Sequence, residues 1–328
     1  EIDITGNRVA VLDGARISAD GGGGGGTVHI GGGWQGQDAT LANSQQTIVQ
    51  ANTEISANAI DNGNGGEVVV WADGHTTVNS EIQAKGGALG GNGGRVETSG
   101  KESLAANVAA NTSAANGEAG QWLLDPSNLT ILSDADFQNP TPFQFTGQNG
   151  ELVFSTNDVS VSPTDSFLRA STVVDGLESN GTVVIQTTGQ TAGEGNLTVS
   201  APILVSQDLS EGTFIPSLTL QAQGEINIDA AIGLLPGQSA FGGFDLNLSY
   251  DIAKPVYIDA PLYLGDFGGL VLSPFDVGTS SPITPTGQLP LDGVNLLSGM
   301  NNTVEPGPLF INRIISTPAN QQLQTVQQ

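Results

Sequence analysis

The sequence predicts an all-β fold of the β-solenoid type, in which short strands wind in coils that stack on one another. Short strand patterns recur along the chain at intervals of about 25–30 residues, the length of one such coil. The chain holds 46 glycines and is only 5% aromatic, a composition that favours strands and turns over helices. Its strand candidates alternate apolar and polar residues, which turns one face of each strand inward.

A first set of repeats occupies the amino-terminal part of the chain. Each has an apolar-x-Ala triplet, a Gly/Asn-rich connection, a short Val-bearing strand and then glycine. The triplets are Ile17/Ala19, Ile55/Ala57, Ile82/Ala84 and, more weakly, Val108/Ala110. The strand positions are Val28, Val68, Val96 and Trp122, at intervals of 40, 28 and 26 residues. The long first interval predicts an inserted loop at WQGQDATLANSQQT (34–47).

A second set of repeats alternates more regularly. Its members are LTVSAPI (197–203), INIDAAI (226–232) and VYIDAPL (256–262), which start 29 and 30 residues apart. Further strand candidates lie at 183–189, 218–224, 246–252 and 270–276. Pro202 and Pro261 fall near strand ends, where a missing N–H does least harm. We therefore expect one coil per repeat, with stacked coils sharing a continuous core.

The six glycines at 21–26 are typical of a flexible linker or of a tight corner between strands. Their flanks match repeats that lack the run, so we expect a corner. Glycine suits a sharp corner because it adopts positive φ without steric cost.

The formal net charge is −25, from 8 basic and 33 acidic residues. Such a surface repels phosphate backbones and anionic lipids, so we expect no nucleic-acid partner and no membrane-surface binding. The chain has no cysteine, so no disulfide holds the fold. No stretch approaches the roughly 18 apolar residues of a transmembrane helix. The first residues lack a signal pattern, and we expect any targeting segment to lie outside this sequence.

Composition divides the chain into four parts. Residues 1–125 form Gly-rich coils, and residues 181–275 form the second set of coils. The segment 126–180 concentrates phenylalanine and predicts a transition or a lateral elaboration: Phe137, Phe143, Phe145, Phe154 and Phe167. Residues 276–328 are rich in proline and end in a polar tail, which predicts an irregular segment.

Four pieces of the sequence carry a resemblance to a known family: VVVWADG (68–74), IQAKGG (82–87), GGNGGRVETSGK (90–101) and WLLDPSNLTI (122–131). Over about residues 1–131 the chain resembles the large bacterial exoproteins of the filamentous-haemagglutinin type, which are exported by two-partner secretion. The resemblance implies a right-handed parallel β-helix, a secreted or cell-surface location, and a role in adhesion or surface structure. It also implies an outer-membrane secretion partner for the precursor. The family's amino-terminal secretion domain has no counterpart here, so we expect this chain to be part of a longer precursor.

Residue types that commonly carry chemistry are few. His29 and His75, the two histidines, stand at non-equivalent positions beside the repeat strands, without a second histidine nearby. We expect both to be surface or loop residues, and we expect no metal site and no cofactor. The sequence has no nucleophile-elbow motif, and the resemblance supplies no catalytic residue.

Three residues are candidates for surface interaction: Trp71, Asp229 and Asp259. Asp229 and Asp259 are outward and equivalent in successive repeats, where stacking would bring them about 5 Å apart. Such a pair could hold a cation or serve acid–base chemistry, although solvated carboxylates on an acidic rod are the simpler interpretation. Trp71 has the opposite parity to Val68 and Val70, which predicts stacking on a sugar or packing under a neighbouring loop or subunit.

These observations favour a secreted, non-enzymatic β-solenoid that acts as a cell-surface adhesin or an extracellular structural element. Unpaired edges at open end coils would let copies stack into homo-oligomers or filaments. A glycan or another receptor on a host or neighbouring cell is the expected partner. The alternative is a carbohydrate-binding or polysaccharide-cleaving β-helix, whose signature would be a cleft with clustered acidic and aromatic side chains. A passive stalk, with function elsewhere in the precursor, is a third hypothesis.

Overall fold

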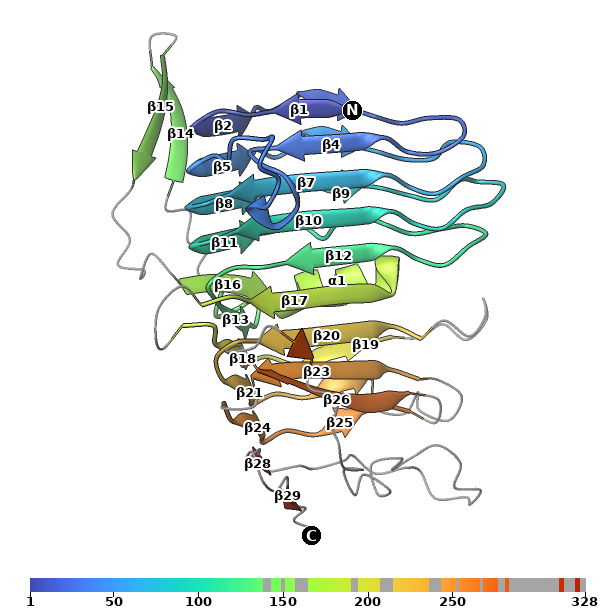
Figure 1. Cartoon of the computed structure of the whole chain (residues 1–328), viewed down its shortest axis with the longest axis vertical. Helices are drawn as coiled ribbons and strands as arrows, with labels where there is room; N and C mark the ends of the chain where they lie inside the picture. Colours follow the sequence, from blue (N-terminus) through green and yellow to red (C-terminus); the bar gives the residue numbers. More distant parts are fainter. Residues whose placement is uncertain are drawn as a thin grey trace.

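The structure is a computed structural model. It describes residues 1–137, 143–148, 151–156, 165–189, 194–206, 215–235, 243–251, 254–265, 268–276, 281–282, 313–315 and 322–324. The described chain is all-β, with long parallel sheets and one α-helix. The amino-terminal strands lie at one end of a stack, and the strands of its long sheet follow in sequence order along it (Figure 1).

One long sheet runs the length of the stack. Its order is β1 (Ile2–Ile4), β4 (Thr27–Ile30), β7 (Glu67–Ala72), β10 (Arg95–Gly100), β12 (Gln121–Leu124), β17 (Thr182–Thr187), β20 (Ser217–Ala222), β23 (Asp245–Asp251), β26 (Gly269–Asp276) and β27 (Ser281–Pro282). All its neighbours pair in parallel except β26 and β27.

Two shorter sheets accompany each half of the long one. The amino-terminal half has β2 (Arg8–Val11), β5 (Gln46–Val49), β8 (His75–Val78) and β11 (Ser103–Ala106), and also β3 (Arg16–Ser18), β6 (Glu54–Ser56) and β9 (Ile82–Gln83). The carboxyl-terminal half has β16 (Asp165–Arg169), β13 (Asn128–Leu132), β18 (Leu197–Val199), β21 (Ile226–Ile228), β24 (Val256–Ile258), β28 (Arg313–Ile315) and β29 (Gln322–Gln324), and also β19 (Ile203–Val205), β22 (Ile232–Leu234) and β25 (Leu262–Tyr263).

The chain visits the three sheets in a fixed order, and we call one such circuit a coil. It passes from β4 to β5 to β6 and returns to the long sheet at β7, which pairs with β4. Because each circuit returns one strand further along, successive coils stack through backbone hydrogen bonds. The sequence therefore predicted the all-β, stacked-strand architecture correctly.

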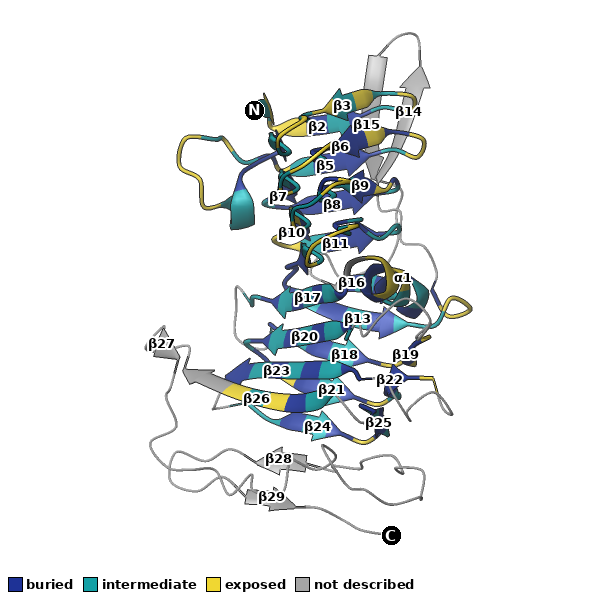
Figure 2. Ribbon diagram, turned by 90° about the vertical axis from the view of Figure 1, so that its right-hand side faces the viewer, coloured by how far each residue is buried: buried dark blue, intermediate teal, exposed yellow. Residues whose placement is uncertain are grey.

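A single apolar core fills the inside of the stack. The inward residues of the long sheet lie in register and are fully buried: Val28, Val68, Val96, Trp122 and Val183. The same core continues through the later coils to Leu246 and Leu270. Figure 2 shows the buried segments following one another along the stack. A lone coil could not bury this face, so the stability of each coil depends on its neighbours.

The expected registers of both repeat sets are confirmed, with one exception. Ile17, Ile55 and Ile82 pair in register, and so do the starts of the second set, Leu197, Ile226 and Val256. The fourth triplet of the first set, Val108/Ala110, was wrong by two residues. Gln83 bridges to Asn111, which sets Ala110 against Ile82 and Thr112 against Ala84. A register shift of two residues leaves the same face of the strand inward. The alternation of apolar and polar residues therefore does not distinguish the two registers.

Close backbone approach explains most glycines of the connections. A Cβ on Gly66 would overlap the carbonyl oxygen of Gly26, and one on Gly94 would overlap that of Gly66. Within the six-glycine run only Gly24 has positive φ, at 151°. The run turns the chain inside the stack, as expected for a corner, but tight stacking rather than positive φ is the main reason for glycine.

The segment 126–180 contains two strands outside a hairpin, the hairpin itself and a helix. β13 pairs with both β16 and β18, and β14 (Phe143–Gln148) pairs antiparallel with β15 (Glu151–Thr156). The helix α1 (Ala170–Asn180) ends at Gly181, whose φ of 72° gives a left-handed cap. Within the described residues no helix has the length and apolar character needed to cross a membrane.

Two of the predicted segments lie partly outside the described residues. The side chains of Phe143, Phe145 and Phe154 are not described, whereas Phe137 is buried and lies 4.5 Å from the Arg169 guanidinium. Of the Pro-rich segment 276–328, the structure describes Asp276 and the strands β27, β28 and β29.

Candidate functional site

The loop between β4 and β5 lies over the outer face of the long sheet, in front of β7 and β10 (Figure 1). It contains the short 3-10 segment η1 (Trp34–Gly36). Gly36, with φ of 62°, sits so close to the Trp71 indole that a Cβ there would lie 2.6 Å from the ring. This is the loop that the long interval in the first repeat set predicted.

Trp71 and Asp73 anchor the loop from below. Trp71 is 4% exposed, and its Nε1 donates a hydrogen bond to Asp73 Oδ1 at 3.1 Å. Asn43 Nδ2 donates to the same Oδ1 at 3.0 Å and to the Gly36 carbonyl at 2.9 Å. The expectation that Trp71 packs under a neighbouring loop is confirmed, and its ring is not on the accessible surface.

Gln35 joins the loop to two buried carboxyl groups. It adopts φ 52° and ψ 24°, a left-handed conformation that few non-glycine residues take. Its backbone N–H donates to Glu97 Oε2 at 2.7 Å, and its side-chain Nε2 donates to Asp125 Oδ2 at 3.4 Å. Beside it, the Arg95 guanidinium lies 4.5 Å from the Trp34 ring and pairs with Glu67.

Burial dominates the chemistry of both carboxyl groups. Glu97 is 0% exposed, and its burial raises its pKa to about 8, so that it is mainly protonated at neutral pH. Its Oε1 has no hydrogen-bond partner among the described residues. Asp125 is 6% exposed, and burial raises its pKa to about 6.

Asp125 is held by several donors. Thr188 Oγ1 donates to its Oδ1 at 3.0 Å, and Gln186 Nε2 donates to its Oδ2 at 3.1 Å. Its backbone N–H donates to Ser99 Oγ at 3.0 Å. The hydrogen bonds that Thr188 and Gln35 donate to its carboxylate lower the pKa of Asp125 and offset part of the effect of burial, because they stabilise the ionised form.

A groove of about 530 Å³ opens beside the loop, over the long sheet. Its lining is Gln35, Gly36, Gln37, Asn43, Trp71, Asp73, Lys101, Asp125, Gln186, Thr188 and Gln223. Glu97 is not among the lining residues, because Gln35 lies between it and the groove. Apart from Trp71, sequence analysis missed these residues, since the contacts of Gln35 join positions 62 and 90 residues apart. The inserted loop was the one available signal.

The expectation that both histidines are surface or loop residues is wrong. His29 is 7% exposed, and its Nδ1 lies 2.8 Å from Asp3 Oδ1 and its Nε2 lies 3.2 Å from Glu67 Oε1. His75 is 5% exposed and contacts Ser103 and Thr77 through its two ring nitrogens. Burial lowers the pKa of His75 to about 4. Residues of neighbouring coils cover both imidazole rings. The sequence pattern of a single repeat does not predict this burial.

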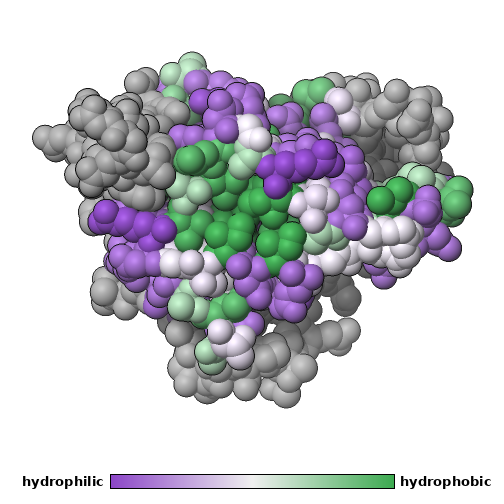
Figure 3. All heavy atoms as spheres, turned by 90° about the horizontal axis from the view of Figure 1, so that it is seen from above, coloured by the Kyte–Doolittle hydropathy of each residue, from purple (hydrophilic) through white to green (hydrophobic). Residues whose placement is uncertain are grey.

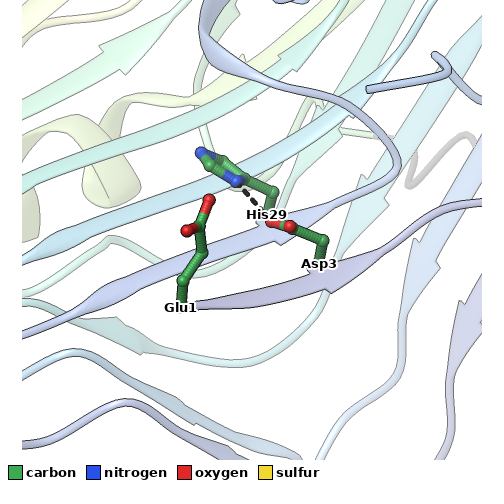
Figure 4. A group of neighbouring side chains, drawn as sticks. All are labelled: Glu1, Asp3 and His29. Carbon is green, nitrogen blue, oxygen red and sulfur yellow. Dashed lines mark hydrogen bonds and ion pairs between the residues drawn. The ribbon is translucent and has the colours of Figure 1, made fainter. Parts of the chain in front are cut away.

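Glu1, Asp3 and His29 form one small cluster (Figure 4), in which one ligand atom from each lies within 4.8 Å of the others. Asp3 and His29 meet because β1 and β4 pair in register. Asp3 already accepts the contact from His29, and the described chain adds no further ligand that would complete a coordination shell.

The remaining candidate residues lie away from the groove. Asp229 and Asp259 are exposed, and they follow the paired strands β21 and β24 on successive coils. Equivalent backbone hydrogen bonds hold them: the Asp229 N–H donates to the Val199 carbonyl, and the Asp259 N–H donates to the Ile228 carbonyl. Trp71 lies on the long sheet, so the structure does not bring the three residues into one site.

The amino-terminal end of the stack presents a second surface. Seen from above, an apolar centre is surrounded by hydrophilic residues (Figure 3). Ile2, Ile4 and Ile17 are only partly buried there and pack on the core. Among the described residues, β1, β2 and β3 each pair along one edge only. Their other edges carry unpaired backbone groups.

No protein-family model matches the chain, and no curated protein matches its sequence. The evidence for the candidate site is therefore the geometry of the groove.

Proposed function

We propose that the chain is a right-handed parallel β-helix from a secreted bacterial surface protein, acting as an adhesin or an extracellular structural element. The observation that carries this proposal is the stack of parallel strands around one core in the described residues. Such a stack forms a stiff rod and presents repeated side chains on long outer faces. The resemblance of residues 1–131 to filamentous-haemagglutinin-type exoproteins supports the same role. An outer-membrane secretion partner for the precursor and a surface receptor belong to this proposal.

The proposed role is non-enzymatic. Glycoside cleavage by paired carboxyl groups needs both of them at the scissile bond. Asp73 and Asp125 line the groove, although Asp125 is mostly buried and hydrogen-bonded, whereas Glu97 is shielded by the backbone of Gln35. Asp73 in turn accepts hydrogen bonds from Trp71 and Asn43, which hold the loop. These carboxyl groups are better explained as parts of a binding surface.

For the role as an extracellular structural element, the proposal includes end-to-end assembly of copies of the chain. A second copy stacked on the amino-terminal end would pair the free edges of β1, β2 and β3 and cover Ile2, Ile4 and Ile17. Burial of apolar surface and pairing of the free strand edges would both favour the contact.

Negative-stain electron microscopy of the purified chain tests this proposal. We expect rods at physiological salt, and fibres with a regular axial repeat if copies stack end to end. Imaging with and without calcium separates assembly driven by the coil ends from assembly driven by a cation. Compact particles without a long axis would contradict the rod, and isolated rods at all protein concentrations would contradict end-to-end assembly.

A further inference from the structure

We propose that the groove beside the β4–β5 loop binds a neutral oligosaccharide that lies along the stacking axis. This inference rests on the proposed adhesive function and names the site and the ligand class. It also agrees with the alternative of a carbohydrate-binding β-helix, without cleavage.

The shape of the groove suits a linear chain of sugars. Its lining comes from successive strands of the long sheet: Asp73 follows β7, Asp125 follows β12, Gln186 and Thr188 lie at β17, and Gln223 follows β20. Parallel strands lie about 4.8 Å apart, so the four steps from β7 to β20 span roughly 20 Å. The volume of about 530 Å³ is within the range of ordinary ligand sites.

The lining is rich in side-chain amides, which suit hydroxyl groups. Five of the lining residues carry an amide: Gln35, Gln37, Asn43, Gln186 and Gln223. An amide both donates and accepts hydrogen bonds, as a sugar hydroxyl does. The side chains of Gln37 and Gln223 make no hydrogen bond to any residue that the structure describes, so both are free to bind a ligand.

The charge of the groove selects against acidic sugars. Asp73 and Asp125 face a single cation, Lys101, and the chain as a whole carries −25. A uronate or a sialic acid would meet repulsion at both short and long range. Trp71 forms part of the floor with its ring covered by the loop, so recognition depends on hydrogen bonds rather than on an open aromatic platform.

The groove is organised before any ligand binds. Hydrogen bonds from Thr188 and Gln186 fix Asp125, while Glu97 fixes the backbone of Gln35. Fixed polar groups lose little conformational freedom when a ligand arrives, which favours binding.

Saturation-transfer NMR and titration calorimetry on the full chain test the proposal. The neutral probes are lactose, N,N′-diacetylchitobiose, cellotriose and mannotriose, which separate glycoprotein-type sugars from structural polysaccharides. Trigalacturonate is the acidic probe and the glucosamine trimer is the cationic one. We expect saturable binding of at least one neutral probe and none of trigalacturonate.

Paired variants locate the site. The double variant Gln37→Ala/Gln223→Ala should weaken binding about tenfold or more, since it removes two amides whose side chains make no hydrogen bond to the described residues. Asn227→Ala removes an amide from β21, outside the groove, and should leave binding unchanged. Equal binding by the double variant and the native chain would overturn the inference. So would preference for either charged probe, or no saturable binding of any neutral probe up to about 10 mM.

Adhesion of the same proteins to cell surfaces separates the two proposals. If the rods adhere to cells but the double variant binds the neutral sugars as well as the native chain does, the groove inference fails while the adhesive function stands. If neutral sugars bind in the groove but the rods adhere to no cell surface, the adhesive function fails and the site stands. Circular dichroism and thermal unfolding confirm that each variant is folded.

Discussion

Glu97 is buried although its position in the strand pattern predicts an exposed side chain. It stands at an outward position of β10, yet the loop carrying Gln35 closes over it and leaves it 0% exposed. Its acidic neighbours Asp125 and Glu67 oppose its ionisation further, whereas hydrogen bonds from Gln35 and Ser99 favour it. Burial is the larger effect, so the carboxyl group is mainly neutral at pH 7.

A Glu97→Gln variant should flatten the dependence of stability on pH. The folded pKa of about 8 lies above the ordinary value of 4.5, so the folded state retains a proton that the unfolded state loses. The free energy of unfolding therefore falls as pH rises from about 4.5 to about 8, by a few kcal/mol. Glutamine resembles the neutral form and removes this fall. Urea unfolding at pH 5, 7 and 9 measures the difference.

The contribution of Asp125 and a control variant help to assign the pH effect to Glu97. In the variant, Asp125, with a pKa of about 6, contributes a fall between about pH 4 and pH 6, and the buried His75, with a pKa of about 4, contributes an opposing rise between about pH 4 and pH 6.5. Glu54→Gln is the matched control, because Glu54 is exposed and pairs with Arg16 at the surface. Parallel stability curves for Glu97→Gln and the native chain would contradict the assignment of a neutral Glu97.

Gly94 tests the close stacking of the connections. A Cβ at this position would overlap the carbonyl oxygen of Gly66 on the neighbouring coil. Gly94→Ala should therefore lower the free energy of unfolding by about 1–3 kcal/mol. Gly23→Ala, where a Cβ meets nothing within 4 Å, should be neutral or slightly stabilising. Denaturant midpoints of the two variants measure the contrast, and equal midpoints would contradict the tight stacking.

At the scale of elements, prolines mark positions where the ladder tolerates a missing N–H. Pro202 and Pro261 stand just before β19 and β25, and Ala231 holds the same place before β22. Each follows an alanine, which allows the extended backbone that a following proline requires. Ala231→Pro should leave stability unchanged or raise it by roughly 0.4–1 kcal/mol.

The contrasting substitution is Asn227→Pro in the centre of β21. Asn227 is paired with Thr198 on one side and Tyr257 on the other, so a proline would disturb two parallel ladders. We expect a loss of about 3 kcal/mol or more, measured by thermal or urea unfolding. Similar stability of the two proline variants would show that the coil boundaries are misplaced.

Sequence predicted the strands better than the site. The registers of Ile17, Ile55 and Ile82 followed from repeated patterns, because each coil meets the same core. The helix α1 was not predicted, since its sequence ASTVVDGLESN contains β-branched residues and glycine, which are weak helix formers. The groove depends on Gln35, whose partners Glu97 and Asp125 lie 62 and 90 residues away. Contacts of that range leave no local pattern.

At the scale of the whole molecule, repulsion between acidic side chains opposes the stacking of coils that burial of the apolar core favours. The chain carries a net charge of −25, with only 8 lysines and arginines to balance 33 acidic residues. Stacking brings equivalent positions of successive coils to about the 4.8 Å strand spacing, so that carboxylates such as Asp229 and Asp259 repel each other at low ionic strength. The same repulsion acts between two rods that approach end to end.

Salt should therefore stabilise the fold and promote assembly together. Raising NaCl from about 20 to about 500 mM shortens the Debye length from roughly 20 Å to less than 5 Å, which screens carboxylates on neighbouring coils. We expect Tm to rise by several degrees and any fibres to lengthen over this range. At pH 4, where many surface carboxyl groups are protonated, the increase should be smaller. A Tm that falls or stays constant with salt at pH 7 would show that the acidic side chains are spaced widely enough, or paired well enough, to avoid repulsion.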